Sequence, residues 1–110
     1  MSEHYHDPTD LSLLKEMKKL APAEFDAWAG LDSIVGREGS AIPPKYRELI
    51  AIAVACTTQC PYCIEVHTKA AKKAGASREE VVEASLLAAA LRAGGAATHG
   101  LMALKFFDKQ

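Results

Sequence analysis

Two cysteines separated by two residues form the strongest chemical signal in the sequence. The motif CPYC, Cys60 to Cys63, follows an apolar segment and opens a run typical of a helix. At a helix start the two side chains share one face, with Cβ atoms roughly 5–6 Å apart. A disulfide needs about 3.5–4.5 Å, so closing it requires local tightening, and a strained disulfide exchanges readily. The free amides and dipole of a helix N-terminus also favour a thiolate.

A histidine and an acid stand at spacings that suit proton transfer to these thiols. His67 follows Cys63 by four residues and Cys60 by seven, so the three side chains project to one side of the helix. An imidazole there can take a proton from a thiol directly or through a water. Glu48 could orient that imidazole or relay its proton. Cys60, Cys63, His67 and Glu48 are therefore the predicted catalytic residues, whereas Cys56 lies inside the apolar run and is expected to pack.

Other uses of a cysteine pair fit the sequence less well. A c-type haem site needs histidine directly after the second cysteine, and Ile64 stands there. A thioredoxin fold needs more strands and a downstream proline facing the pair, but the last proline is Pro61. Structural zinc needs four ligands, of which the pair and His67 supply three. The fourth would come, at no characteristic spacing, from His4, His6, His99 or Cys56. No metal or cofactor site is predicted.

The first half of the sequence predicts helices bounded by caps and prolines. Residues 1–9 are expected to be loosely ordered, and a helix is expected from Asp10 as N-cap. A second helix is predicted from Pro22 to Ile34, followed by a loop over 36–42. Pro43 and Pro44 begin a third helix, which is expected to end at 57–59. Its eight consecutive apolar residues are expected to be buried on all sides.

The second half extends the same all-α pattern. A helix is predicted from Cys60 to about residue 74, with Gly75 after its end. Ser77 and Glu80 form a capping box for an alanine-rich helix, which is expected to be interrupted at 94–95 before a last segment over 101–107. No stretch alternates with period two. The prediction is an all-α domain of about six helices over residues 1–110, with its core at 43–107.

Composition narrows the partners and the compartment. The chain has 110 residues, 13 basic and 14 acidic, and a net charge of −1, without a basic run that would suit nucleic acid. The apolar run at 49–56 is far shorter than the roughly 18 residues of a membrane span. The polar N-terminus lacks a secretory pattern, so a cytoplasmic location is expected. The fully apolar helix and the Ala- and Gly-rich helix are expected to pack against copies of the chain.

The assembled residues resemble the AhpD-like branch of the carboxymuconolactone decarboxylase family. The resemblance rests on E-x11-C-x-x-C-x-x-x-H, which reads ELIAIAVACTTQCPYCIEVH from Glu48 to His67, and it extends over roughly 43–107. It implies an all-helical subunit that forms a homo-oligomer, often a trimer or hexamer. It also implies a thiol-dependent hydroperoxide reductase or disulfide oxidoreductase.

The resemblance also assigns roles to the four residues. It makes Cys63 the attacking thiol and Cys60 its resolving partner, with Glu48 and His67 in the proton relay. The helix dipole alone would favour Cys60, but the i+4 spacing to His67 favours Cys63, which is the predicted nucleophile. One departure is Tyr62, which stands where well-characterised peroxidase members can carry a histidine.

The expected substrates are a small hydroperoxide and an external dithiol reductant, either a protein or a lipoyl-type group. Two alternatives stay open. One is a non-enzymatic redox-sensing or binding module, which would form the disulfide without turnover. The other is a carboxymuconolactone decarboxylase-like enzyme, although decarboxylating members generally lack the cysteine pair.

Overall fold

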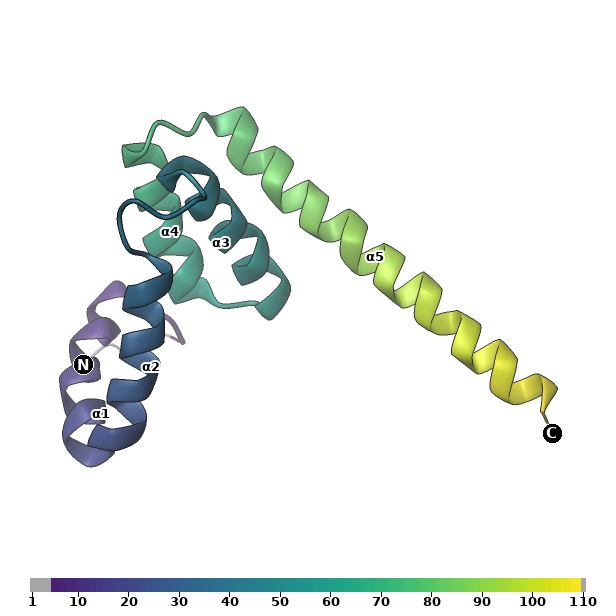
Figure 1. The fold of residues 1–110 in the computed structure, drawn as a ribbon, viewed down its shortest axis with the longest axis horizontal. Helices are drawn as coiled ribbons and strands as arrows, with labels where there is room; N and C mark the ends of the chain where they lie inside the picture. The colour runs from purple at the N-terminus through teal and green to yellow at the C-terminus, as the bar shows by residue number, and fades with distance from the viewer. Residues whose placement is uncertain (1–4, 110) are drawn as a thin grey trace.

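Helices and their connections make up the whole of the computed structural model, which describes residues 5–109 (Figure 1). A 3-10 helix, η1, precedes five α-helices, and the described residues contain no strand. The elements are η1 (Pro8–Leu13), α1 (Leu14–Leu20), α2 (Pro22–Val35), α3 (Pro44–Thr58), α4 (Pro61–Lys73) and α5 (Arg78–Asp108). The all-α prediction is confirmed, and the number of helices is close to the expected six. Loose order was expected at 1–9; residues 1–4, and His4 with them, lie outside the described residues, whereas 8–9 belong to η1.

The N-terminal segment, residues 5–13, is fixed by a local cap. Asp7, and not the expected Asp10, is the N-cap residue of the first helix. Its carboxylate accepts the Thr9 amide at 2.9 Å, while the Asp10 carboxylate accepts the Asp7 amide at 3.1 Å. This reciprocal capping box satisfies amides that a helix start leaves unpaired. The chain then folds back through α1 and α2, which lie side by side (Figure 1).

Helices α3 and α4 form an antiparallel pair joined by a tight corner. Pro44 begins α3, as predicted, and Gln59 ends it in the left-handed conformation with a φ of 58°. The Cys60 amide donates to the Ala55 carbonyl at 3.1 Å, which closes the end of α3. Helix α4 starts at the next residue and ends before Gly75, whose φ is 97°. The helix predicted from Cys60 to about residue 74, with Gly75 after its end, is thus confirmed within one residue at each end.

Helix α5 is one continuous helix of 31 residues, and the expected interruption at 94–95 was wrong. Two glycines weaken a helix by about 1 kcal/mol each relative to alanine but keep its backbone hydrogen bonds. The surrounding alanines are strong helix formers, and the Thr98 hydroxyl donates to the Gly94 carbonyl at 3.0 Å. The predicted capping box is present, because Ser77 accepts the Glu80 amide at 3.1 Å and Glu80 accepts the Ser77 amide at 2.9 Å.

The buried core is small and lies where α3 meets α4 and α5. The apolar residues that are buried are Ile52, Ala55, Ala71 and Ala88. The apolar run of α3 was expected to be buried on all sides, but Ile50 and Val54 are 51% and 54% exposed. The radius of gyration is 18.1 Å, whereas a compact chain of this length has about 13 Å. One chain therefore does not bury its own apolar residues.

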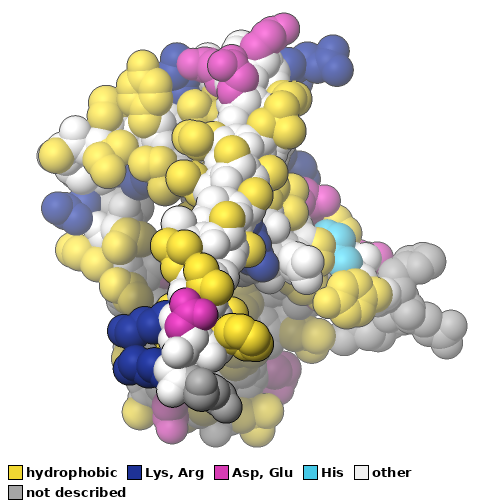
Figure 2. Space-filling view, turned by 90° about the vertical axis from the view of Figure 1, so that its right-hand side faces the viewer, with side chains coloured by type: hydrophobic (Ala, Val, Ile, Leu, Met, Phe, Trp, Pro, Cys, Tyr) yellow, Lys and Arg dark blue, Asp and Glu magenta, His cyan; other side chains and the backbone are white. Residues whose placement is uncertain are grey.

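Helix α5, whose C-terminal part extends away from the other helices (Figure 1), has more of these exposed apolar side chains than any other helix. Figure 2 shows its hydrophobic side chains exposed along the helix. The exposed large apolar residues of its middle and C-terminal parts are Leu86, Leu87, Leu91, Leu101, Met102, Leu104, Phe106 and Phe107. Within residues 5–109, α5 alone has the length and hydropathy of a membrane span. A core helix of a soluble protein can have the same length and hydropathy, so these properties do not show whether lipid or protein covers α5.

Candidate functional site

The two cysteines of the CPYC motif meet at the corner between α3 and α4. Cys60 is the N-cap residue of α4, and its sulfur accepts the Cys63 amide at 3.3 Å. Pro61 takes the first helical position, where no amide is needed. Both cysteines are part-buried free thiols. We call residues 60–63 the redox turn.

The redox turn makes the two thiols unequal. The pKa of Cys60 is lowered by a hydrogen bond from the Cys63 thiol and then by the backbone amides of Cys63 and Tyr62. The pKa of Cys63 is raised to about 11 by that same hydrogen bond, by burial and by the negative charges of Cys60 and Asp32. Donors that point at a sulfur favour its charged form, and a thiol that donates keeps its proton. The turn therefore favours a thiolate on Cys60, which the dipole alone had also favoured.

Glu48 and His67 form the second part of the site, across the α3–α4 contact. The Glu48 carboxylate lies 2.6 Å from Nδ1 of His67, and their side chains are 19% and 33% exposed. Because a carboxylate only accepts, the proton of this hydrogen bond lies on Nδ1. The acid thus fixes the orientation of the ring. This arrangement matches the pairing expected from the sequence.

The two pairs are neighbours on α4 without a direct link. Cys63 and His67 are one helical turn apart, yet no hydrogen bond among the described residues joins His67 or Glu48 to a sulfur. A proton passing between the pairs would need an intervening group, such as a water. Within residues 5–109 no group of three His, Cys, Asp or Glu side chains is placed to hold a metal ion.

The remaining cysteine and the last histidine lie on other elements. Cys56 is part-buried on α3, inside the apolar run. His99 lies on the exposed part of α5, where its ring nitrogen Nδ1 is 3.2 Å from the Gly95 carbonyl one turn earlier. That contact is local to the helix.

Sequence reasoning missed the partners of Tyr62. The Tyr62 hydroxyl donates to the Asp10 carboxylate at 2.8 Å, across 52 residues of sequence. The His6 ring packs edge-on against Tyr62, with ring centroids 4.3 Å apart. The Asp10 carboxylate, which stabilises the protonated hydroxyl, raises the pKa of Tyr62. No periodicity or motif connects residues so far apart, so only the folded chain reveals this contact.

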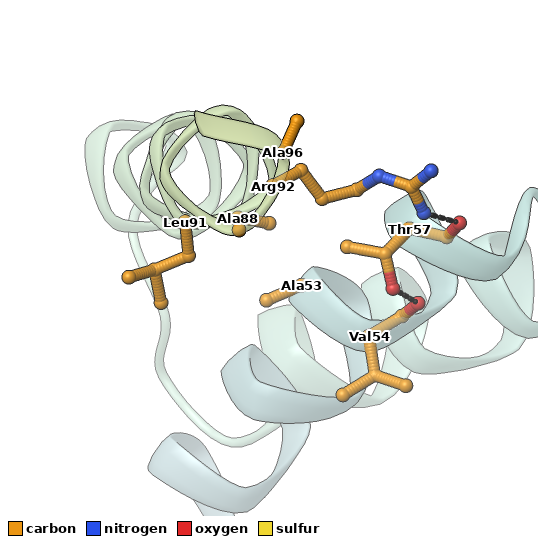
Figure 3. Close-up of a pocket in the computed structure, with 8 residues that line it drawn as sticks. Ala53, Val54, Thr57, Ala88, Leu91, Arg92 and Ala96 are labelled. Carbon is orange, nitrogen blue, oxygen red and sulfur yellow. Dashed lines mark hydrogen bonds between the residues drawn. The ribbon is translucent and has the colours of Figure 1, made fainter. Parts of the chain in front are cut away.

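An open groove of about 620 Å³ runs between α3 and α5. Its walls are Ala53, Val54, Thr57, Ala88, Leu91, Arg92, Gly95 and Ala96. Figure 3 shows the small side chains of the two helices facing one another, with the Arg92 guanidinium donating to the Thr57 carbonyl at 2.7 Å. None of the four predicted catalytic residues lines it. The groove marks where α5 is held against α3 and carries no reactive group.

Comparisons with known proteins identify a family, and the relatives reported below are described as uncharacterized. Residues 22–106 match the carboxymuconolactone decarboxylase family. A Paracoccus denitrificans protein described as uncharacterized protein 4 in cox locus is 39% identical over 93% of this chain and 91% of its own length. An uncharacterized Haemophilus influenzae protein is 44% identical over 86% and 83%, and one from Cupriavidus necator is 32% identical over 79% and 76%.

Proposed function

Because the chain belongs to the carboxymuconolactone decarboxylase family, we propose that it is a thiol-dependent redox enzyme of the AhpD-like type. In this proposal the redox turn reduces small hydroperoxides and is regenerated by an external dithiol. The single observation that carries the proposal is the polarised thiol pair, in which Cys63 and the backbone donate to the Cys60 sulfur. A thiol with a lowered pKa is a nucleophile at neutral pH, whereas an ordinary buried cysteine is inert.

The reaction begins with attack of a thiolate on the terminal oxygen of the hydroperoxide. The O–O bond breaks, the sulfur becomes a sulfenic acid, and the organic part leaves as an alkoxide that takes up one proton. The second thiol then attacks the sulfenic sulfur, so that a disulfide forms and water leaves. The sequence predicted Cys63 as the first nucleophile. The order of the two pKa values supports Cys60, and we propose Cys60 for this step.

Glu48 and His67 act in this proposal as the proton source for the leaving alkoxide. A protonated His67, held by the Glu48 carboxylate at 2.6 Å, would donate its other ring proton, directly or through a water. The carboxylate keeps the ring in one orientation throughout, so the relay needs no side-chain rearrangement.

Regeneration proceeds by thiol–disulfide exchange. A dithiol from a protein or a lipoyl-type group attacks the Cys60–Cys63 disulfide, forms a mixed disulfide, and leaves as its own disulfide. This chemistry suits a reducing compartment, and we propose the cytoplasm. It uses neither a metal nor an organic cofactor.

We also propose that the working form is a homo-oligomer, a trimer or hexamer as the family resemblance implies. Support comes from the exposed apolar side chains of α5 and the exposed Ile50 and Val54 of α3. When copies of the chain pack symmetrically, an apolar face of one copy can cover an apolar face of another.

Hydroperoxide consumption with dithiothreitol as reductant tests the proposed activity. We expect wild-type turnover, and loss of turnover by at least a hundredfold in Cys60→Ser and in Cys63→Ser, because each removes one half of the disulfide. Equal rates in wild type and both variants would contradict the proposal. A reversible disulfide without turnover would indicate a redox module, and lactone decarboxylation that survives loss of both thiols would indicate a decarboxylase.

Trapping of the first sulfenic acid distinguishes the two thiols. A single equivalent of hydroperoxide with dimedone should label Cys60 in the Cys63→Ser variant faster than Cys63 in the Cys60→Ser variant. Faster labelling of Cys63 would restore the assignment made from the sequence.

A further inference from the structure

Tyr62 lies inside the redox turn, and its side chain is held from outside that turn. Its hydroxyl donates to Asp10 at 2.8 Å, and the His6 ring packs against its face. The Asp10 oxygen that accepts this bond also accepts the Asp7 amide at 3.1 Å. The acceptor of the Tyr62 hydroxyl is therefore itself held in place by the capping box of the N-terminal segment.

The attachment acts on the part of the chain that must move during disulfide formation. In the reduced turn the Cys63 thiol donates a hydrogen bond to the Cys60 sulfur, whereas a disulfide needs the two sulfurs about 2.05 Å apart. Closing the bond therefore draws Cys60 and Cys63 closer and tightens the turn. Tyr62 is the residue directly before Cys63, so any tightening displaces the ring that Asp10 and His6 hold.

We propose that Tyr62 is a positioning residue of the redox centre, through which the N-terminal segment holds the redox turn in its dithiol geometry. This proposal rests on the proposed disulfide chemistry but not on the identity of the oxidant. The tether stabilises the reduced turn relative to the oxidised one, so it makes the dithiol a weaker reductant. By linkage, oxidation of the thiols must in turn loosen the Tyr62–Asp10 contact by the same factor.

The test equilibrates the protein with reduced and oxidised dithiothreitol, in which the protein dithiol gives two electrons and two protons to the reagent disulfide. Tyr62→Phe removes only the hydroxyl. Loss of a typical hydrogen bond should shift the equilibrium about fivefold toward the protein disulfide, or about 20 mV for a two-electron couple. The measurement uses thiol counting by mass and needs no hydroperoxide turnover.

Tyr46 supplies the matched control. It lies in the first turn of α3, half exposed, with its ring 5.1 Å from the Lys45 ammonium and no hydrogen bond from its hydroxyl among the described contacts. Tyr46→Phe is the same chemical change away from the redox turn, and it should leave the dithiol–disulfide equilibrium unchanged. An equal shift in both variants would overturn the proposal.

Asp10 provides a second variant if Tyr62→Phe is poorly folded. Asp10→Ala removes the acceptor and should shift the equilibrium in the same direction. In the double variant the two shifts should not add, because both changes break one contact. Additive shifts, or an unchanged equilibrium in both single variants, would overturn the proposal.

Amide hydrogen exchange can distinguish the proposed coupling from a role in which Tyr62 only stabilises the fold. The Asp10 amide donates to the Asp7 carbonyl at 2.9 Å, so its protection reports the fold of the N-terminal segment. We expect faster exchange of this amide in the oxidised wild type than in the reduced form, and no such redox dependence in Tyr62→Phe. Identical exchange in both redox states of the wild type would contradict the coupling. If hydroperoxide turnover fails while the fivefold shift is found, the proposed oxidant is wrong and the positioning role stands.

Discussion

The redox turn and helix α5 differ in whether their side chains find partners within the same chain. The polar contacts described for the redox turn and for the neighbouring Glu48–His67 pair lie within one chain: backbone amides and a thiol on Cys60, Glu48 on His67, and Asp10 on Tyr62. Along α5, most large apolar side chains have no cover in the same chain. The comparison indicates that one chain supplies the polar partners of its redox turn, whereas it leaves the apolar side chains of α5 exposed.

Charge on the exposed part of α5 should have the largest effect. Leu101→Glu with Leu104→Glu should separate the proposed oligomer, with association weakened on the order of a thousandfold, because two exposed leucines per copy that the proposed interface would cover are replaced by charges. Light scattering after size exclusion measures the mass. Lys105→Glu, a charge change at a position already charged, is the control and should leave the mass unchanged.

Two outcomes of this experiment would contradict the contrast drawn between the redox turn and α5. A wild-type protein with the monomer mass of 11.8 kDa at micromolar concentration would contradict the proposed homo-oligomer. A double variant that is monomeric but has altered thiol reactivity would show that the redox turn needs the assembly after all.

Neutralising the acid of the Glu48–His67 pair should have an intermediate effect. Glu48→Gln keeps the size of the side chain but removes the carboxylate that accepts from Nδ1 of His67 and orients the ring, so hydroperoxide turnover should fall on the order of a hundredfold. The control is Glu65→Gln, which removes an acid of α4 paired only with Lys69 at 3.7 Å and should keep turnover. Turnover of Glu48→Gln equal to wild type would remove this pair from the mechanism.

The smallest expected effects are changes in the pH at which the two thiols react. They test the difference in pKa between Cys60 and Cys63. In a Cys56→Ser background, alkylation of Cys60 should reach half its maximal rate below the pH typical of a free thiol, because its pKa is lowered. Cys63→Ala removes the thiol donor, so this midpoint should move up and the rate at pH 7 should fall several-fold.

The reverse variant gives the opposite sign. In Cys60→Ala the pKa of Cys63 should move down from about 11, because the hydrogen bond and charge that raise it are gone. Asp32→Asn should move it in the same direction by less. A wild-type protein in which Cys63 titrates below Cys60 would contradict the described polarity of the turn.

Local chemistry in the sequence predicted the helices well. Pro44, Gly75 and the Ser77–Glu80 capping box each fix a helix end through their own backbone or side chain, and each is found as predicted. The interruption at Gly94 was not found, because a glycine lowers helix stability only modestly and its alanine-rich neighbours compensate.

Contacts between distant segments were only partly accessible from the sequence. Glu48 and His67 face one another because α3 and α4 pack antiparallel, and the motif spacing indicated this pair. The Tyr62–Asp10 contact depends on where the N-terminal segment returns, which no spacing encodes. The expected burial of the α3 apolar run was wrong for another reason: within one chain there is too little surface to cover Ile50 and Val54.

The unbroken length of α5 affects how the stability of this helix depends on protein concentration. At 1.5 Å per residue its 31 residues span about 46 Å, and Ala88 and Arg92 fasten only its first half to α3. In an assembly of copies, the cover of the second half follows mass action, so the stability of the helix rises with protein concentration. The abundance of the chain in a cell, as well as its sequence, would then set how much of α5 is shielded from water.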